Sequence, residues 1–180
     1  MPVHHAPLCL ACGLCCDGTL FKDVELQPGD NAARLTALGL PVQQLKTKTR
    51  FAQPCAALGA DCRCAIYAQR PARCRQFDCV QLAALANGTT TPDAALRTVQ
   101  RARRLAQKVR RLLRSLGDHD EQRALRLRFQ RVQRRFEKGG STAEATAVFA
   151  ELSLAMHRLN LILSRSFYPA GLIDSAHPQS

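Results

Sequence analysis

The clearest pattern of apolar and polar positions lies in the C-terminal half of the chain. Apolar residues recur at three- and four-residue steps between Leu96 and Leu116, which predicts an amphipathic helix. Thr91 can cap this helix, Pro92 suits its first position, and Gly117 marks its end. One long helix is therefore predicted just after the middle of the chain.

Two more helices are predicted in the same half. One begins near Asp118, where Glu121 three residues later gives the spacing of a capping box, and ends at Gly139. Its apolar face consists of Leu125, Phe129, Val132 and Phe136. The next helix runs from Ser141 to about Phe167. Because the connections are short, neighbouring helices should be antiparallel, and we expect a three-helix antiparallel body.

The N-terminal half shows no comparable periodicity. Asp30 can cap a short helix over residues 32–38, and Pro71 favours a helix that runs to about Ala86. Large apolar residues are otherwise sparse, and a segment with so small a core usually needs a staple, which metal can supply. We therefore expect a mainly α protein in which a small, irregular, metal-stapled cysteine-rich module packs with the three-helix antiparallel body.

The polar run from Asn87 to Pro92 is the natural boundary between the two halves. The predicted organisation is a cysteine-cluster metal-binding module over residues 1–90, an arginine-rich helical body over residues 91–168 and a tail over residues 169–180. No segment approaches about 18 uninterrupted apolar residues, so we expect no membrane association.

Cysteine is the residue that separates the halves most sharply. All 9 cysteines lie within the first 79 residues of the 180-residue chain. Disulfides are disfavoured because the count is odd, adjacent Cys15 and Cys16 are poor partners, and the N-terminus lacks the pattern of a secretory leader. Thiolates at two-residue spacing can instead direct several sulfurs at one metal. We expect metal binding in the reducing cytoplasm.

The cysteine spacing also carries a family resemblance. The chain reads Cys9-x2-Cys12-x2-Cys15-Cys16, then Pro54-Cys55, then Cys64-x-Ile66-Tyr67-x2-Arg70-Pro71-x2-Cys74-Arg75, and later Cys79. Over roughly residues 9–80 this pattern resembles the YkgJ-type cysteine-cluster family, a zinc- or iron-chelating domain. The resemblance implies eight metal ligands, which are Cys9, Cys12, Cys15, Cys16, Cys55, Cys64, Cys74 and Cys79. Cys62 is additional, and is either a further ligand or a small buried residue.

The residues leave the metal open between zinc and iron. Eight thiolates suit two tetrahedral zinc ions, or one four-iron cluster with the other thiols free for a second site. Cys9, Cys12 and Cys15 match the first three ligands of a bacterial ferredoxin, whereas the usual fourth is absent. Cys74 and Cys79 would point about 140° apart on an unbroken helix. Either that helix is interrupted, or the two cysteines serve different sites.

Basic residues near the cysteines have a predicted role in charge balance. Eight thiolates around two divalent ions would leave a local charge of about −4. Four arginines close to the ligands can offset this charge or donate to sulfur, although a solvated face is the alternative. These are Arg63, Arg70, Arg73 and Arg75.

The formal net charge is +12, and the C-terminal half carries most of it. Between Arg97 and Lys138 there are 15 basic and 4 acidic residues. This surface can attract a nucleic acid or an acidic protein, or can simply be the solvated side of amphipathic helices. The candidate polyanion-binding residues are Arg103, Arg104, Arg110 and Arg111.

These features predict a metal-binding protein with a structural or metal-handling role. The first alternative is an iron–sulfur redox component of an enzyme system, and the second is a protein that binds nucleic acid or an acidic partner through its basic helices. No glycine-rich phosphate loop and no nucleophile elbow occur in the chain, so a binding protein is favoured over an enzyme.

Overall fold

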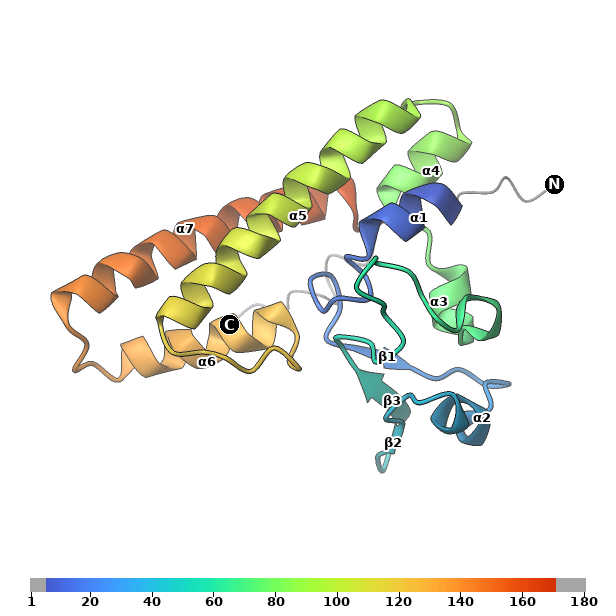
Figure 1. Ribbon diagram of the computed structural model, residues 1–180, viewed down its shortest axis with the longest axis horizontal. Helices are drawn as coiled ribbons and strands as arrows, with labels where there is room; N and C mark the ends of the chain where they lie inside the picture. The colour runs from blue at the N-terminus through green and yellow to red at the C-terminus, as the bar shows by residue number, and fades with distance from the viewer. Residues whose placement is uncertain (1–5, 171–180) are drawn as a thin grey trace.

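Three long helices dominate the structure. The computed structural model describes residues 6–170, so most of the expected tail over residues 169–180 lies outside the described part. The long helices are α5 (Pro92–Ser115), α6 (Leu125–Glu137) and α7 (Ala143–Ser166), as Figure 1 shows. The expected mainly α class is confirmed. We refer below to residues 6–90 as the cysteine-rich segment and to residues 91–168 as the helical body.

Helices α5 and α7 form the principal helix pair. Figure 1 shows α7 returning beside α5 in the opposite direction. Their facing sides meet through fully buried apolar residues, which include Val99 and Leu113 of α5 and Leu152 and Leu159 of α7. Each helix begins with a threonine cap, since the side chains of Thr91 and Thr142 accept hydrogen bonds from backbone N–H groups three residues on.

Helix α7 also has the length and composition of a possible membrane span. Its most apolar window has a mean hydropathy of 1.2. One face of the helix packs into the same core as α5, and 28% of this window is buried.

The start of α6 corrects the sequence prediction. The helix begins at Leu125, and the prediction of a helix from near Asp118 is wrong. The carboxylate of Asp118 accepts hydrogen bonds from Arg128 Nε (2.9 Å) and Arg131 Nη2 (2.7 Å) of α6, so it serves as an ion-pair partner instead of a cap. With residues 116–124 as the connection, α6 runs in the same general direction as α5 in Figure 1. The expected antiparallel arrangement therefore applies to α7 against α5 and α6, and is wrong for α5 and α6.

The cysteine-rich segment consists of short elements joined by turns. Its helices are α1 (Ala6–Cys12), α2 (Ala32–Ala37), α3 (Ala72–Gln76) and α4 (Val80–Ala86), with a 3-10 turn η1 (Tyr67–Gln69). The predicted short helix is confirmed as α2, although Asn31 is the residue that caps it. Asp30 accepts hydrogen bonds from the N–H groups of Gln27 and Ala72, both at 2.8 Å, and so ties the start of α3 to the loop between β1 and α2.

A small sheet in this segment was not predicted. Strands β1 (Asp23–Glu25), β2 (Gln43–Gln44) and β3 (Thr49–Ala52) pair in the antiparallel order β1-β3-β2. Val24 faces Phe51 across β1 and β3, and both side chains are buried. The strands span two to four residues, which is too short for an alternating pattern to be recognised.

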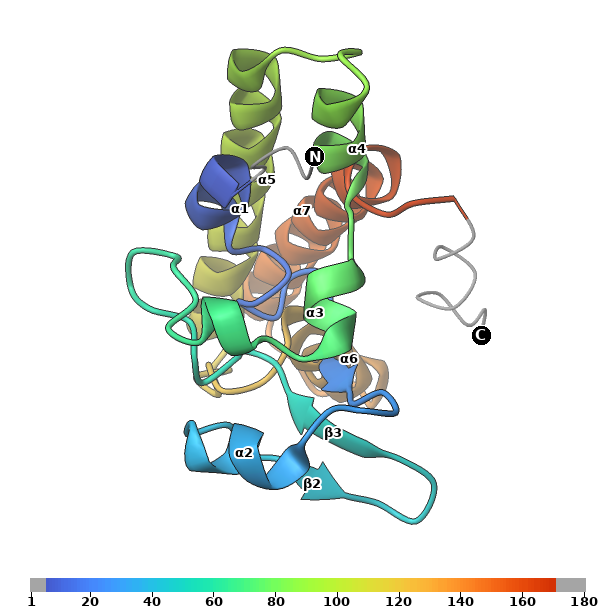
Figure 2. The same cartoon turned by 90° about the vertical axis from the view of Figure 1, so that its right-hand side faces the viewer.

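Two hydrophobic cores hold the molecule together. The larger core combines the helical body with Leu14, Leu20, Cys79 and Leu82 of the cysteine-rich segment. The Tyr168 hydroxyl, just after α7, donates to the Leu20 carbonyl (2.5 Å), and Figure 2 shows α1 and α4 beside α5. The smaller core lies around α2 and the sheet, and consists of Val24, Leu35, Leu40, Phe51, Ala57 and Ile66.

Candidate metal centre

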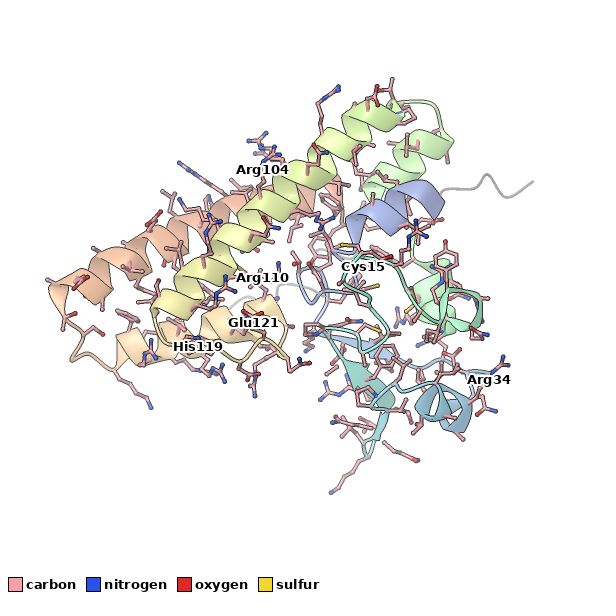
Figure 3. All side chains as sticks on the ribbon, in the orientation of Figure 1. Cys15, Arg34, Arg104, Arg110, His119 and Glu121 are labelled. Carbon is pink, nitrogen blue, oxygen red and sulfur yellow. The ribbon has the colours of Figure 1, made fainter. Side chains whose placement is uncertain are left out.

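The cysteines converge on one cavity. This cavity has a volume of about 420 Å³, and all nine cysteines are among the residues that line it. They come from α1, α3, the residue before α4 and two loops, and the sequence separation between Cys9 and Cys79 is 70 residues. Figure 3 shows sulfur atoms, including that of Cys15, around the space between α1, α3 and these loops.

Cys9 and Cys12 lie on the last turn of α1. Their three-residue spacing places both thiols on the same side of the helix. Gly13 follows with φ +66°, and a Cβ atom on it would lie 3.1 Å from the Cβ of Cys62. Glycine therefore permits both the left-handed end of α1 and the close approach of the second cysteine loop.

Cys15 and Cys16 are adjacent, and their Sγ atoms are 3.7 Å apart. Cys15 packs against the larger core, as do Cys9 and Cys12. The backbone carbonyl of Cys16 accepts a hydrogen bond from the N–H of Cys55 (2.8 Å), which fixes the first cysteine loop to the second.

The second loop folds back on itself between Cys55 and Cys64. Leu58 and Cys64 form an isolated antiparallel bridge, and the Gly59 N–H donates to the Arg63 carbonyl at 2.7 Å. Cys62, at the tip, adopts a positive φ of 65°, which is uncommon for a residue with a Cβ atom. The additional cysteine thus lines the cavity and contacts the first loop at Gly13.

A break in the predicted helix over residues 71–86 separates the last two cysteines. Cys74 lies on α3, whereas Cys79 precedes α4, so the prediction of one continuous helix is wrong and the alternative of an interruption is confirmed. The two cysteines also pack differently. Cys79 belongs to the larger core, whereas Cys74 packs with Cys55 and Cys64 against the smaller one.

The environment favours protonated thiols in the absence of a cation. Burial raises the pKa of Cys9 and Cys55 to about 11 and that of Cys12 and Cys74 to about 12. The hydrogen bond with Cys15, and then burial, raises the pKa of Cys16. Burial likewise raises the pKa values of Cys64 and Cys79. A metal would have to displace these protons, so metal binding here should release protons.

The four arginines near the cysteines occupy different places. Arg70 and Arg73 line the cavity, and the guanidinium of Arg70 opposes the rise in pKa of Cys9, Cys16, Cys64 and Cys74. The guanidinium carbon of Arg70 lies 3.6 Å from the centre of the Tyr67 ring, and Arg70 Nε donates to the Tyr67 carbonyl (2.9 Å). Arg75 donates to the Arg70 carbonyl (2.7 Å), and exposed Arg63 lies beside Asp61.

The four arginines predicted to bind a polyanion divide into two pairs. Arg103 donates to the Ala11 carbonyl (2.7 Å), and Arg110 contacts the Asp17 carboxylate (3.0 Å), so both fasten α5 to the cysteine-rich segment. Arg104 and Arg111 line a second cavity between α5 and α7. Figure 3 shows Arg104 and Arg110 on opposite edges of α5.

The donor set fits a thiophilic metal. Nine thiols around one cavity are the ligands that zinc and iron–sulfur centres use, and the cavity wall also carries Gln53, whose Oε1 is buried without a hydrogen-bond partner. Within residues 6–170, no three Cys, His, Asp or Glu side chains are close enough to hold one ion. Metal binding therefore requires the cysteine sulfur atoms to come closer together.

Some residues that shape the centre were not identified from the sequence. Gln53 lies 2% exposed on the cavity wall, and nothing in its sequence context distinguishes it from other polar residues. Gly18 has φ +77°, and a Cβ atom on it would lie 3.0 Å from the Cα of Ala124. Its carbonyl accepts from the N–H of Leu125 (2.9 Å), which connects the first cysteine loop to α6.

Comparison with known protein families gives one match. Residues 8–99 match the family described as "CxxCxxCC: Putative zinc- or iron-chelating domain". The match covers just over half of the chain, from α1 into the beginning of α5. No curated protein and no solved structure matches the chain.

Proposed function

The chain belongs to the CxxCxxCC family of zinc- or iron-chelating domains, and on this premise we propose that its cysteines hold metal in two sets of four. The observation that carries the proposal is that cysteines from five places in the chain line one cavity. The role proposed for this metal is structural or metal-handling, in the cytoplasm, where thiols remain reduced.

The first proposed set consists of Cys9, Cys12, Cys15 and Cys79. All four pack with the larger core. After burial, the nearby charge of Cys79 contributes to the raised pKa values of Cys9 and Cys12. This set would tie α1 to the start of α4.

The second proposed set consists of Cys16, Cys55, Cys64 and Cys74. The last three pack against the smaller core, and Cys16 is joined to Cys55 by a backbone hydrogen bond. Next to burial, the charge of Cys16 contributes to the raised pKa values of the other three. Adjacent Cys15 and Cys16 would then serve neighbouring sites.

The type of metal, the balance of its charge and its effect on the fold follow from the residues around the two sets. Four thiolates suit tetrahedral zinc, and also suit an iron–sulfur cluster. Two Zn²⁺ ions with eight thiolates carry a charge of about −4, and Arg70 is the cation best positioned to offset part of it. Bound metal would supply cross-links between short elements that bury little apolar surface of their own.

Metal analysis of single-cysteine variants tests the two sets. Protein purified without air or chelator should contain two zinc ions and no visible absorption, or iron with a broad band near about 400 nm. In the zinc case, Cys12→Ser and Cys74→Ser should each lose one ion, and the double variant should lose both. Cys62→Ser is the matched control and should retain both ions.

The results of these measurements would distinguish two four-cysteine sites from the alternatives. Loss of all metal from either single variant would mean one polynuclear site and would refute the two sets. Loss of metal from Cys62→Ser would make it a ligand and reject the assignment of the eight. A brown protein whose absorption bleaches reversibly on reduction would favour the alternative, an iron–sulfur redox component.

A further inference from the structure

A second cavity lies in the helical body. It has a volume of about 660 Å³ and is lined by residues of α5 and α7 only. We propose that this groove binds the phosphate backbone of a nucleic acid. Its six basic residues are Arg101, Arg104, Lys108 and Arg111 of α5, and Arg158 and Arg165 of α7.

The basic residues form two helical stripes that face one groove. Those of α5 follow one another at steps of three and four residues, and those of α7 are seven residues apart, so each set lies along one side of its helix. The stripe from Arg101 to Arg111 extends for about 15 Å, and its charges recur at about one helical turn. An extended chain with regularly spaced negative charges can contact the whole stripe.

Little in the described structure neutralises this groove. Its lining contains no Asp or Glu. Among residues 6–170 the basic side chains of the groove form one ion pair, between Lys108 Nζ and Glu151 Oε1 at 2.7 Å. Arg103 and Arg110 on the same helix are instead bonded to the cysteine-rich segment. The positive charge of the groove is therefore not needed to hold the fold together.

The hydrogen-bonding chemistry favours phosphodiester over acidic peptide. Arginine and lysine are donors only, and the neutral polar side chains of the lining are limited to Thr98 and Ser166. A phosphate backbone presents acceptors only, which guanidinium groups bind through two parallel hydrogen bonds. A peptide backbone also presents N–H groups that would find few acceptors here.

The lining also predicts the kind of nucleic-acid binding. It contains no aromatic side chain on which a base could stack, and its apolar residues are Leu105, Leu161 and Ile162. Binding should therefore depend little on base sequence and strongly on salt concentration, because released counterions provide most of the free energy.

Titration of the full-length protein as purified, with a fluorescent single-stranded oligonucleotide of mixed sequence, tests the proposal. The test variant replaces Arg104, Arg111, Arg158 and Arg165 by Gln, and all four are exposed. The matched control replaces Arg34, Lys46, Arg134 and Lys138 by Gln, which removes the same charge from exposed positions outside the groove. Unchanged circular dichroism in both variants would show that the fold is retained.

We expect the test variant to bind about 10- to 100-fold more weakly at low salt, and the slope of log affinity against log salt to fall by about 3. The control should change affinity by less than about threefold. Equal weakening in both variants, or no binding by the parent protein, would overturn the proposal. Displacement of the oligonucleotide by polyglutamate as readily as by inorganic polyphosphate would also overturn it, in favour of an acidic protein partner.

Discussion

The cysteine-rich segment and the helical body are stabilised in different ways. In the helical body, two 24-residue helices bury continuous apolar faces against each other. In the cysteine-rich segment, no helix exceeds seven residues and no strand exceeds four. The smaller core contains six buried residues, one of which is an alanine. Helices this short are marginal without tertiary contacts.

The two regions therefore differ in what they need in order to be stable. The helical body can gain its stability from apolar burial, and its buried polar groups are paired. The cysteine-rich segment places nine thiols where another segment would place apolar side chains. Its shape should therefore depend on metal, whereas α5 and α7 should remain folded without it.

The largest effect of a single substitution is expected at the buried ion pair of the helical body. Asp118 and Arg128 are each 2% exposed. Burial opposes ionisation of Asp118, but hydrogen bonds from Arg131 and Arg128 outweigh it and lower its pKa. Asp118→Ala would leave the Arg128 charge buried without a carboxylate partner. The free energy of unfolding should therefore fall by about 3–5 kcal/mol in urea titrations.

The exposed pair of Glu121 and Arg114 provides the control for this prediction. Glu121→Ala should lower the free energy of unfolding by less than about 1 kcal/mol. Metal content per folded molecule should be unchanged in both variants. If Asp118→Ala lowered metal content in proportion to stability, the helical body and the cysteine-rich segment would not be stabilised independently.

A smaller effect is expected at the junction of the two cysteine loops. Gly13→Ala would place a Cβ atom at φ +66° and 3.1 Å from the Cβ of Cys62. Backbone strain and this contact together should cost about 1–3 kcal/mol, measured by chemical unfolding of the metal-loaded protein. Gly39→Ala has a similar φ of +88° without a neighbour within 4 Å, so it measures backbone strain alone. An equal loss of stability in Gly13→Ala and Gly39→Ala would mean that the close approach of the two cysteine loops does not contribute to stability.

The pH dependence of the metal-free protein should be the smallest effect at neutral pH, because it appears only in alkaline solution. Burial raises the pKa of Cys9, Cys12, Cys55 and Cys74 above 9.0, to about 11 or 12. The folded state thus retains protons that the unfolded chain releases. Stability should be fully present below about pH 9 and should fall as pH rises towards 12, by at most about 1.4 kcal/mol per pH unit for each thiol.

Urea titrations of chelated, reduced protein at a series of pH values measure this slope. Cys12→Ser should reduce it, because one buried thiol is removed. A slope that is unaffected by the substitution would indicate that other groups cause it.

Sequence alone could predict the helical body because its pattern is periodic and long. The apolar stripes identify α5 and α7, and Thr91 with Pro92 marks the start of α5. The start of α6 was predicted wrongly because Asp118 and Glu121 have the spacing of a cap. The spacing around Asp118 does not show that its carboxylate binds Arg128, ten residues further along the chain, in the folded protein.

The candidate site was predictable in its residue types and not in its arrangement. Cysteine spacing identified the thiols, and the break between α3 and α4 was one of two alternatives. The contact of Gly13 with Cys62 and the burial of Gln53 arise from long-range packing, which no local pattern encodes. Likewise, an arginine count did not separate Arg103, which bonds to Ala11, from Arg104, which lines the groove.

The most direct test is backbone hydrogen exchange of the protein before and after anaerobic chelation. The account predicts that chelation removes protection around residues 13–20 and 55–65, while the centres of α5 and α7 keep theirs. Protection that is unchanged in the two cysteine loops of a verified metal-free protein would contradict it, because the cysteine-rich segment would then hold its shape without metal.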